Sequence, residues 1–367
     1  MSTRRCPRCQ RTYADPARFC PQDGSPLMDV HGATPAPKPP VKVDDPRKNT
    51  TVGLRTMVRQ AAQQRGPGME RVSQLVGQIL DQRYEVLKRL GEGGMSFVYI
   101  AREVSGQDTV AIKVLSPKLR EDKNSVERLR REAGLAMRLE HPNVCRILRL
   151  GETEEGLIYL VMPYLPGELL ADREVREGPM SLEAGIPLLV QMAQGLQHAH
   201  DLQIVHRDLK PENVMLVPDE KSPGAVQAVV MDFGLAKERR QEPEVAKLTA
   251  TGIVLGTPEF MSPEQIRGKA IDARSDIYAL SILAFEMFTG QLPFTGRTAQ
   301  EMMIARLKGK PRLLREVRPE MPAKLEAALA KAMSLDPNDR YTSMTAFAEA
   351  LIGTEETGVF ARLFGRP

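Results

Sequence analysis

The pattern of apolar residues changes once along the chain, and this change constrains the fold more than any other feature. From Arg83 onward, short β-type runs alternate with turn signals, as in YEVLKRLGEG, SFVYIAREV and TVAIKVL. A charged helix is predicted from Asn124 to Leu139, and beyond Pro179 the periodicity is mostly helical. A strand-rich part followed by a helix-rich part predicts an α+β protein with two lobes.

Composition and charge agree with a folded enzyme. The 367 residues, of which 42% are hydrophobic and 27% charged, suffice for two domains or one large bilobal domain. The 51 basic and 47 acidic residues nearly balance, so charge gives no reason to expect a nucleic-acid partner. The most apolar window, from Ile277 to Phe285, is far shorter than the roughly 20 residues of a spanning helix, and no apolar run follows the basic N-terminus. We therefore expect a soluble protein with no membrane partner.

The first thirty residues carry two knuckles of equal spacing, each with proline directly after its cysteine. Cys6-x₂-Cys9 and Cys20-x₂-Asp23 have the spacing of a zinc ribbon with one ligand exchanged, and the segment resembles short N-terminal zinc ribbons. We expect residues 1–29 to bind Zn²⁺ through these four side chains, with His31 or water as rivals of Asp23. Clustered, reduced cysteines favour a cytoplasmic location. The alternative is a disordered tail with reactive thiols.

Other segments outside the two lobes have weaker patterns. Residues 30–68 read as a flexible Pro-rich linker, with a short helix from Leu54 to Gln64 that either packs on a neighbouring surface or docks a partner. Residues 69–80 are predicted to form an amphipathic helix leading into the first lobe. Residues 354–367 are read as a frayed tail. Its small apolar cluster comprises Val359, Phe360, Leu363 and Phe364.

A glycine-rich turn and a strand lysine are the first residues that suggest chemistry. Gly91, Gly93 and Gly94 in GEGGMSFVY lie between two predicted strands, where missing side chains would let backbone N–H groups approach phosphate. A plain hairpin turn is the alternative. Lys113 ends the apolar strand VAIK, so it is either a snorkelling surface residue or a buried cation with an assigned anion.

Acidic and amide side chains farther along suit a phosphate-bound cation. Glu132 lies on the charged helix and offers an anion for the lysine. HRDLKPEN contains Asp208, Lys210 and Asn213, and Asp232 ends the apolar run AVVM. A carboxylate and an amide that converge on one site suit a hard cation bridging phosphates, while Asp208 could accept a hydroxyl proton and Lys210 offset charge.

In this combination and order, the motifs resemble the signature set of protein kinases, most closely the bacterial Hanks-type serine/threonine kinases. The resemblance runs from about Leu80 to Ile352, and it implies a kinase domain over 81–353 with a small β-rich N-lobe and a larger helical C-lobe. It implies transfer of the γ-phosphoryl group of ATP to serine and threonine hydroxyls of proteins. The rival hypothesis is a pseudokinase scaffold that binds nucleotide or partners without chemistry.

The resemblance also implies a role for each motif residue. The residues implied to bind the nucleotide are Gly91, Gly93, Val98, Ala111, the gatekeeper Met162, and the hinge backbone at Pro163 and Leu165. Lys113 would hold the α- and β-phosphates while paired with Glu132. Asp208 would be the catalytic base and Lys210 the γ-phosphate contact. Asn213 and Asp232 would hold Mg²⁺, which Mn²⁺ could replace.

Three further residues match structural markers of this family. Glu264 in SPE is expected to pair with Arg340, and Asp276 is expected to brace the catalytic loop. Lys210 and Thr257 match serine/threonine rather than tyrosine specificity.

Departures from the family pattern are few. Ser96 replaces the third glycine of the glycine-rich loop, and Pro163 replaces the more usual acidic hinge residue but still presents a carbonyl. The stretch between Asn213 and Asp232 is longer than a tight hairpin, and we expect the excess to be a surface loop.

Regulation is expected in the segment KLTATGIVLGTPEFMSPEQ. Thr249 and Thr251 are candidate autophosphorylation sites, and Arg207 would pair with the phosphorylated residue. Such modification implies transient self-association, while the zinc ribbon would dock partners.

Overall fold

A computed structural model describes the two lobes and three short stretches before them. The described residues are 3–5, 12–14, 28–29, 72–93, 96–106, 108–117, 123–219, 224–233 and 258–353. The chain divides into two compact units, Met1–Gly53 and Leu54–Pro367. Within the described residues, no helix is both long and apolar enough to cross a membrane.

The first unit contains a three-stranded antiparallel sheet in the order β2-β1-β3. Its strands are β1 (Thr3–Arg5), β2 (Thr12–Ala14) and β3 (Met28–Asp29). The expected zinc ligands Cys6, Cys9, Cys20 and Asp23, and the rival His31, lie outside the described residues. The zinc module therefore stays a prediction.

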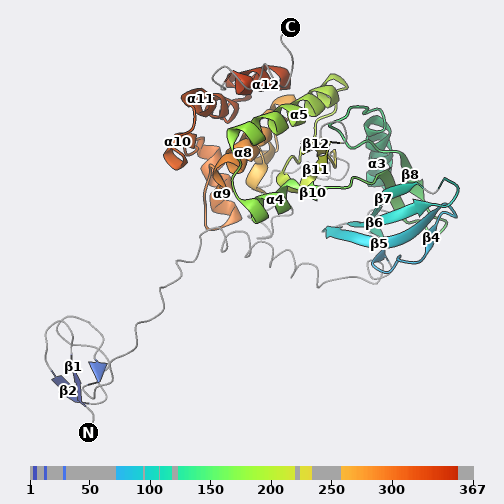
Figure 1. The fold of residues 1–367 in the computed structure, drawn as a ribbon, viewed down its shortest axis with the longest axis horizontal. Coiled ribbons are helices and arrows are strands. Elements are labelled where there is room, and N and C mark those ends of the chain that lie inside the picture. The colour runs from blue at the N-terminus through green and yellow to red at the C-terminus, as the bar shows by residue number, and fades with distance from the viewer. Residues whose placement is uncertain are drawn as a thin grey trace. The chain divides into compact units, whose positions relative to one another are not determined.

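The N-lobe is built on a six-stranded antiparallel sheet in the order β4-β5-β6-β7-β9-β8 (Figure 1). Its strands are β4 (Ile79–Leu80), β5 (Tyr84–Gly93), β6 (Ser96–Glu103), β7 (Thr109–Leu115), β8 (Arg149–Glu152) and β9 (Ile158–Pro163). Phe97, Tyr99 and Ala101 alternate along β6 and are fully buried, which confirms the predicted strand. Helix α3 (Lys123–Ala136) packs on the sheet through Leu129.

The helix expected over residues 69–80 was wrong for its described part. Residues 73–78 contain turns, and Ile79–Leu80 form a strand that pairs with β5. Val72 and Leu75, which gave the helical spacing, are buried in the core of the N-lobe, and the Tyr99 hydroxyl donates a hydrogen bond to the Val72 carbonyl. Tertiary packing has overridden the local pattern here, and the domain begins before residue 81.

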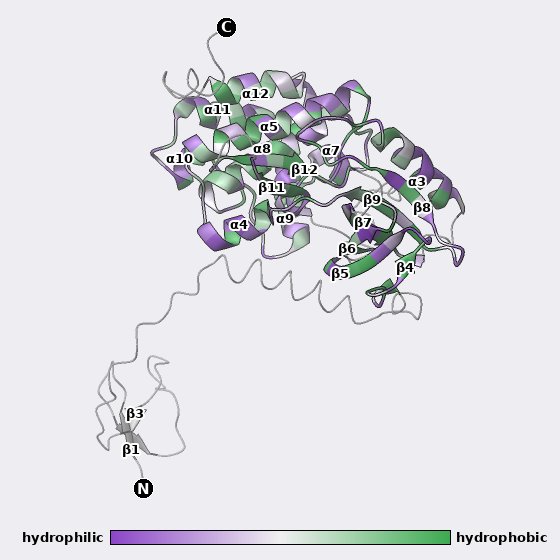
Figure 2. Ribbon diagram, turned by 45° about the vertical axis from the view of Figure 1, so that its right-hand side comes forward, coloured by the Kyte–Doolittle hydropathy of each residue, from purple (hydrophilic) through white to green (hydrophobic). Residues whose placement is uncertain are grey.

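The C-lobe is mostly helical. Its helices are α4 (Leu170–Glu177), α5 (Leu182–Asp201), α7 (Pro263–Ile266), α8 (Ala273–Thr289), α9 (Ala299–Lys308), α10 (Leu314–Val317), α11 (Ala323–Ala332) and α12 (Met344–Ile352). Three single 3₁₀ turns are η2 (Pro211–Asn213), η3 (Pro258–Phe260) and η4 (Pro337–Asp339). Helix α8 is buried along almost its whole length inside the lobe (Figure 2), and α5, α10, α11 and α12 pack against it.

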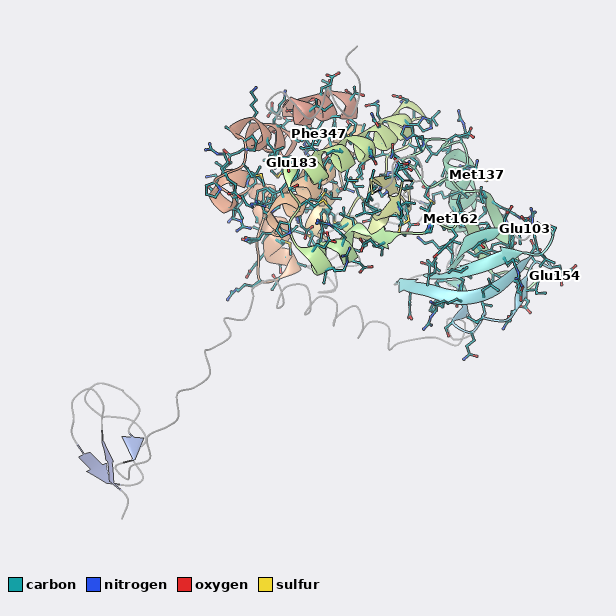
Figure 3. All side chains as sticks on the ribbon, viewed as in Figure 1. Glu103, Met137, Glu154, Met162, Glu183 and Phe347 are labelled. Carbon is teal, nitrogen blue, oxygen red and sulfur yellow. The ribbon has the colours of Figure 1, made fainter. Side chains whose placement is uncertain are left out.

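A small second sheet lies where the C-lobe faces the N-lobe. Strand β10 (Glu168–Leu169) pairs with β11 (Val214–Pro218), which forms an antiparallel hairpin with β12 (Val226–Val230). Residues 164–167 connect β9 of the N-lobe to β10, and Figure 3 labels Met162 near this crossing. Helix α12 ends at Ile352, and the tail 354–367 is outside the described residues.

Candidate active site

One buried carboxylate holds the backbone of the loop that carries the expected catalytic residues. Asp276 of α8 accepts hydrogen bonds from the backbone N–H groups of His206 at 2.8 Å and Arg207 at 2.9 Å. His200 Nε2 of α5 lies 2.8 Å from the same carboxylate. Burial alone would raise the pKa of Asp276, but His200, His206 and the backbone donors hold it below its ordinary value. The expected bracing role of Asp276 is confirmed by these contacts.

Histidine 206 joins this loop to the end of the β11–β12 hairpin. Its Nε2 lies 2.8 Å from the Met231 carbonyl oxygen, and its Nδ1 lies 3.2 Å from the Asp208 backbone nitrogen. Because the carbonyl only accepts and the amide only donates, the ring carries its proton on Nε2. The ring also packs edge-on against Phe233 at 4.7 Å between centroids.

Asp208 lies between two polar neighbours on its own loop. Asn213 Nδ2 donates to the Asp208 carbonyl oxygen at 2.7 Å and lies 3.4 Å from its Oδ2. Lys210 Nζ is 3.5 Å from the same Oδ2. Since the Asn213 amide nitrogen faces Asp208, its Oδ1 is the atom that can ligate a cation.

Asp232 is brought to this loop by the hairpin. Val214 pairs with Val230, and the Met231 N–H donates to the Asn213 carbonyl at 2.8 Å, so Asn213 and Asp232 lie at the same end of the two strands. Lys113 Nζ of β7 reaches across from the N-lobe to Asp232 Oδ2 at 2.7 Å. Glu132 lies half-buried on α3, and its pairing with Lys113 stays a prediction.

Two non-glycine residues of the site have left-handed backbone conformations. The φ angles are 65° at Arg207 and 61° at Asp232. Such conformations cost about 1 kcal/mol or more for residues with a Cβ, and they persist only where the surroundings hold them. Here the Asp276 carboxylate holds the Arg207 amide, and the hairpin end and the Lys113 ion pair hold Asp232.

The expected nucleotide-binding residues of the N-lobe lie on the four neighbouring strands β5, β6, β7 and β9 and just after β9. Gly91 pairs with Val98 across the β5–β6 hairpin, and Val98 is opposite Lys113 in β7. Ala111 is opposite Met162 of β9, next to the pair Val110–Pro163. Pro163 and Leu165 lie where the chain leaves β9 for the C-lobe. The strands thus place these residues in order from the glycine-rich turn to the crossing between the lobes; Gly94 lies outside the described residues.

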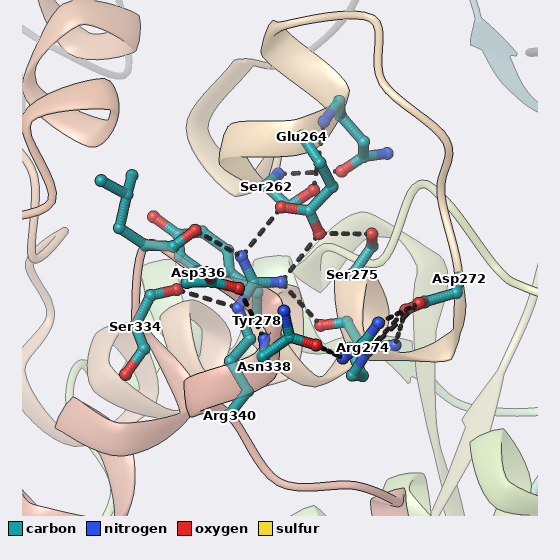
Figure 4. A network of polar contacts seen from close by, with 12 residues as sticks. Ser262, Glu264, Asp272, Arg274, Ser275, Tyr278, Ser334, Asp336, Asn338 and Arg340 are labelled. Atoms are coloured by element: carbon teal, nitrogen blue, oxygen red, sulfur yellow. Dashed lines mark hydrogen bonds and ion pairs between the residues drawn. The ribbon is translucent and has the colours of Figure 1, made fainter.

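A second buried network holds the segment that precedes α8. Arg340 is fully buried and donates to Glu264 Oε1 at 2.7 Å and Oε2 at 2.8 Å, which confirms the expected pair (Figure 4). Burial alone would raise the pKa of Glu264, but Arg340 and the Ser275 hydroxyl hold it below its ordinary value. The neighbouring Gln265 Nε2 donates to the Arg207 carbonyl at 2.8 Å, so helix α7 is tied directly to the catalytic loop.

Sequence reasoning missed a group of glutamates from four elements behind the catalytic loop. They are Glu174 of α4, Glu212 of η2, Glu259 of η3 and Glu286 of α8. Burial, with the charges of the neighbouring glutamates, raises the pKa of Glu174 to about 9 and that of Glu286 to about 8. Three buried oxygens, Glu174 Oε1, Glu259 Oε2 and Glu286 Oε2, accept no hydrogen bond from the described residues. No motif spacing links these positions, so only the folded chain reveals them.

The side chains present fit a phosphate-bound cation. The Asp232 side chain is 38% exposed and that of Asp208 19%, so a bound cation could reach both carboxylates from solvent. The described residues contain no group of three or more His, Cys, Asp or Glu side chains that could hold a metal ion by themselves. One carboxylate and one amide oxygen are what Mg²⁺ takes from a protein when substrate phosphates and water complete its shell.

Comparison with known proteins shows which family the chain resembles. The family model described as protein kinase domain matches residues 84–352. The serine/threonine-protein kinase pkn3 of Myxococcus xanthus is 38% identical over 279 residues, which cover 75% of this chain and 50% of that protein. PrkC of Bacillus subtilis is 36% identical over 267 residues, covering 73% and 40%. The chain thus spans half or less of the length of these relatives.

A solved structure has a similar fold. The crystal structure of the PknI kinase domain from Mycobacterium tuberculosis has a TM-score of 0.60 to this chain and 26% sequence identity, and it covers 76% of this chain and 97% of the other.

Proposed function

Since the chain belongs to the protein kinase domain family, we propose that it is a serine/threonine protein kinase that transfers the γ-phosphoryl group of Mg-ATP to serine and threonine hydroxyls of proteins. One observation carries the proposal: the contacts of Lys113, Asp208, Asn213 and Asp232 form a continuous chain from the N-lobe to the catalytic loop. The pseudokinase alternative has no observation in its favour.

In the proposed reaction, each of these side chains has one task. Bound Mg-ATP supplies the phosphoryl group and a cation that offsets the phosphate charge. Asp208 orients the acceptor hydroxyl and takes its proton as the new oxygen–phosphorus bond forms and the bond to the leaving diphosphate breaks. Lys210, beside Asp208, offsets charge on the transferred group, and Lys113 holds the other phosphates. Asn213 and Asp232 hold Mg²⁺, or Mn²⁺ in its place.

Protein hydroxyls of serine and threonine are the acceptors that the names of the relatives support. Lys210 lies beside the base, as expected for this acceptor class. Thr257, the other marker of the class, lies outside the described residues.

The decisive experiment incubates the purified full-length chain with Mg²⁺, γ-labelled ATP and a mixture of serine- and threonine-containing peptides. Asp208→Asn should lower phosphoryl transfer by about 10²–10⁴-fold and leave ATP affinity within a few-fold. Asp201→Asn, an exposed change at the end of α5, is the matched control and should transfer at the parental rate. Nucleotide binding by a parent that transfers no faster than Asp208→Asn would instead support the pseudokinase.

Regulation through the activation segment belongs to the same proposal. Thr249 and Thr251 lie outside the described residues, and Arg207 is held beside Asp208 by the Asp276 carboxylate. Phosphorylation of either threonine by a second copy of the chain would add about −1.5 to −2 charges for that arginine to bind. Replacing both threonines with alanine should lower activity, as measured on an exogenous peptide.

The N-terminal unit adds a proposed zinc module that docks partners in the cytoplasm. Its support is the spacing of Cys6, Cys9, Cys20 and Asp23 alone. Metal analysis of the full-length protein should find about one zinc per chain, and Asp23→Ala should weaken zinc retention more than His31→Ala.

A further inference from the structure

Arg306 of helix α9 is fully buried and takes no part in the chemistry proposed above. Its Nη1 donates to the Pro258 carbonyl at 2.6 Å, and its Nη2 donates to the Glu259 carbonyl. The guanidinium carbon lies 5.6 Å from the centroid of the Phe294 ring, which is within cation–π range. Arg306 therefore holds the carbonyls of two successive residues of η3.

Packing alone does not explain a buried charge at this position. Taking a guanidinium out of water costs free energy, and an apolar side chain of similar size is often as stabilising or more so. The Arg306 Nε is buried without an acceptor among the described residues, which adds to that cost. Helix α9 already contributes to an apolar cluster, which comprises Met261, Ile266, Met303 and Leu307. What the guanidinium adds is direction, because two donors in a rigid fork fix two acceptors at once.

The two carbonyl contacts fix the backbone of η3. Each peptide unit is planar, so holding the carbonyls of Pro258 and Glu259 also sets the direction of the N–H groups of Glu259 and Phe260. The Pro258 carbonyl accepts a second hydrogen bond from the Met261 N–H at 3.3 Å, which closes the turn. This turn cannot rotate without breaking a hydrogen bond to a charged donor, and such bonds are roughly twice as strong as neutral ones.

The segment that Arg306 holds connects a marker of the acceptor class with the catalytic loop. Turn η3 begins directly after Thr257, which matches serine/threonine specificity in the family resemblance. It leads into α7, where Gln265 donates to the Arg207 carbonyl at 2.8 Å. Helix α9 packs against both η3 and α7. Arg306 therefore anchors a segment that is tied to the loop carrying Asp208.

Electrostatic contacts also place η3 near the catalytic side chains. Burial raises the pKa of Glu259, whereas the charges of Arg306 and Lys210 act in the opposite direction. Lys210 Nζ in turn lies 3.5 Å from Asp208 Oδ2. An acceptor peptide whose hydroxyl reaches Asp208 therefore passes next to η3.

We propose that Arg306 is a positioning residue for the acceptor peptide, because it fixes the η3 backbone beside which that peptide lies. The inference rests on the proposed function and adds a residue to it. The side chains expected to bind ATP and Mg²⁺ lie on other elements, so Arg306 should affect the use of peptide and not that of nucleotide.

Steady-state kinetics of the full-length protein separate positioning from folding. Arg306→Met keeps a long side chain but removes both carbonyl hydrogen bonds. It should lower kcat/KM for the best-phosphorylated peptide of the mixture by roughly 10-fold to 100-fold, because small displacements at a reacting centre have effects of this size. KM for ATP and the rate of ATP hydrolysis without peptide should stay parental. Arg306→Lys keeps the charge but not the fork, so it should lower kcat/KM for peptide less than Arg306→Met does.

Arg312→Met is the matched control. Arg312 is half-buried, it donates to the Leu292 carbonyl at 2.7 Å, and its Nε is also buried without an acceptor among the described residues. Its partner segment follows α8 and is not part of η3. This variant should therefore lose stability in thermal unfolding but keep the parental kcat/KM for peptide.

Three outcomes would overturn the inference. If the parent phosphorylates peptide and Arg306→Met has a parental kcat/KM, only this inference fails and the proposed function stands. Equal losses of peptide phosphorylation and ATP hydrolysis in Arg306→Met, or equal losses of peptide phosphorylation in Arg306→Met and Arg312→Met, would assign Arg306 to folding alone. A parent that phosphorylates no peptide overturns the proposed function and this inference with it. If Arg306→Met does not fold, the same criteria apply to Arg306→Lys.

Discussion

The C-lobe buries carboxylates in two contrasting ways on either side of the catalytic loop. Asp276 is 1% exposed and has a histidine nitrogen and two backbone N–H groups within 2.9 Å. Glu174 and Glu286 are half-buried, but each keeps a buried oxygen that accepts no hydrogen bond from the described residues. The same kind of group therefore has a lowered pKa in one place and a raised pKa in the other. Donors, rather than depth of burial, decide whether a buried carboxylate is charged.

The free energy of unfolding should depend on pH in opposite directions for Asp276 and for the pair Glu174 and Glu286. The folded pKa of Asp276 is lowered, so its contribution is present above the unfolded value near 3.8 and is lost as the pH falls through the folded value. The folded pKa values of Glu174 and Glu286 are raised from 4.5 to about 9 and about 8. Above pH 4.5 the folded state binds more protons than the unfolded state, so these two groups reduce stability as the pH rises toward 9.

The largest expected effect comes from removing Asp276, the buried carboxylate whose hydrogen bonds are all satisfied. Asp276→Ala leaves His200 and the amides of His206 and Arg207 without their acceptor, and it should lower the free energy of unfolding by about 3–5 kcal/mol. Urea unfolding measures the loss. Asp201→Ala, an exposed aspartate on α5, should change the same quantity by no more than about 0.5 kcal/mol. Similar losses in both variants would remove the basis of the comparison.

A third buried carboxylate sharpens the comparison, because Glu264 is paired with the positively charged guanidinium group of Arg340. Arg340→Met leaves Glu264 charged and buried without its ion-pair partner, and it should lower the free energy of unfolding by about 3 kcal/mol. Adding Glu264→Leu should recover about 1 kcal/mol or more of that loss in a double-mutant cycle. Strictly additive losses would mean that the pair is not coupled.

The smallest expected effect is a gain in stability from replacing Glu286, whose buried oxygen lacks a hydrogen-bond donor among the described residues. Glu286→Gln removes a carboxyl that resists ionisation, so the free energy of unfolding at pH 8 should rise by about 1–2 kcal/mol, and the gain should shrink toward pH 5. Thermal unfolding at both pH values measures the difference. Glu183→Gln, at an exposed position on α5, is the control, and it should show no such dependence between pH 5 and pH 8. A gain that is equal at both pH values would contradict the raised pKa.

Contiguous motifs predicted much of the site. HRDLKPEN carries Asp208, Lys210 and Asn213 on one loop, so their proximity follows from the sequence alone. The sequence also indicates how Asp232 comes to lie beside this loop, because the two β-type runs of β11 and β12, separated by turn residues, are typical of a hairpin. Three strands of the N-lobe, β5, β6 and β7, were predicted for the same reason.

What failed was decided by contacts distant in sequence. Val72 and Leu75 have helical spacing, but the N-lobe core buries them in a turn. Glu174 and Glu286 lie on separate helices whose approach depends on packing around α8, and no local pattern carries that information. The Lys113–Asp232 ion pair likewise depends on how the two lobes face each other.

The far end of the β11–β12 hairpin can change in length while its base keeps the site residues in place, and this has a use in protein engineering. Pairing of Val214 with Val230 at its base sets Asn213 and Asp232 side by side, and the Asp219 N–H closes the far end on the Ala225 carbonyl at 2.9 Å. Each doubling of a flexible loop costs only about 0.6 kcal/mol in closure entropy. The far end of this hairpin is therefore a position where a fluorescent reporter or a ligand-controlled domain can be spliced into the chain, with the paired strands insulating the site from the insert.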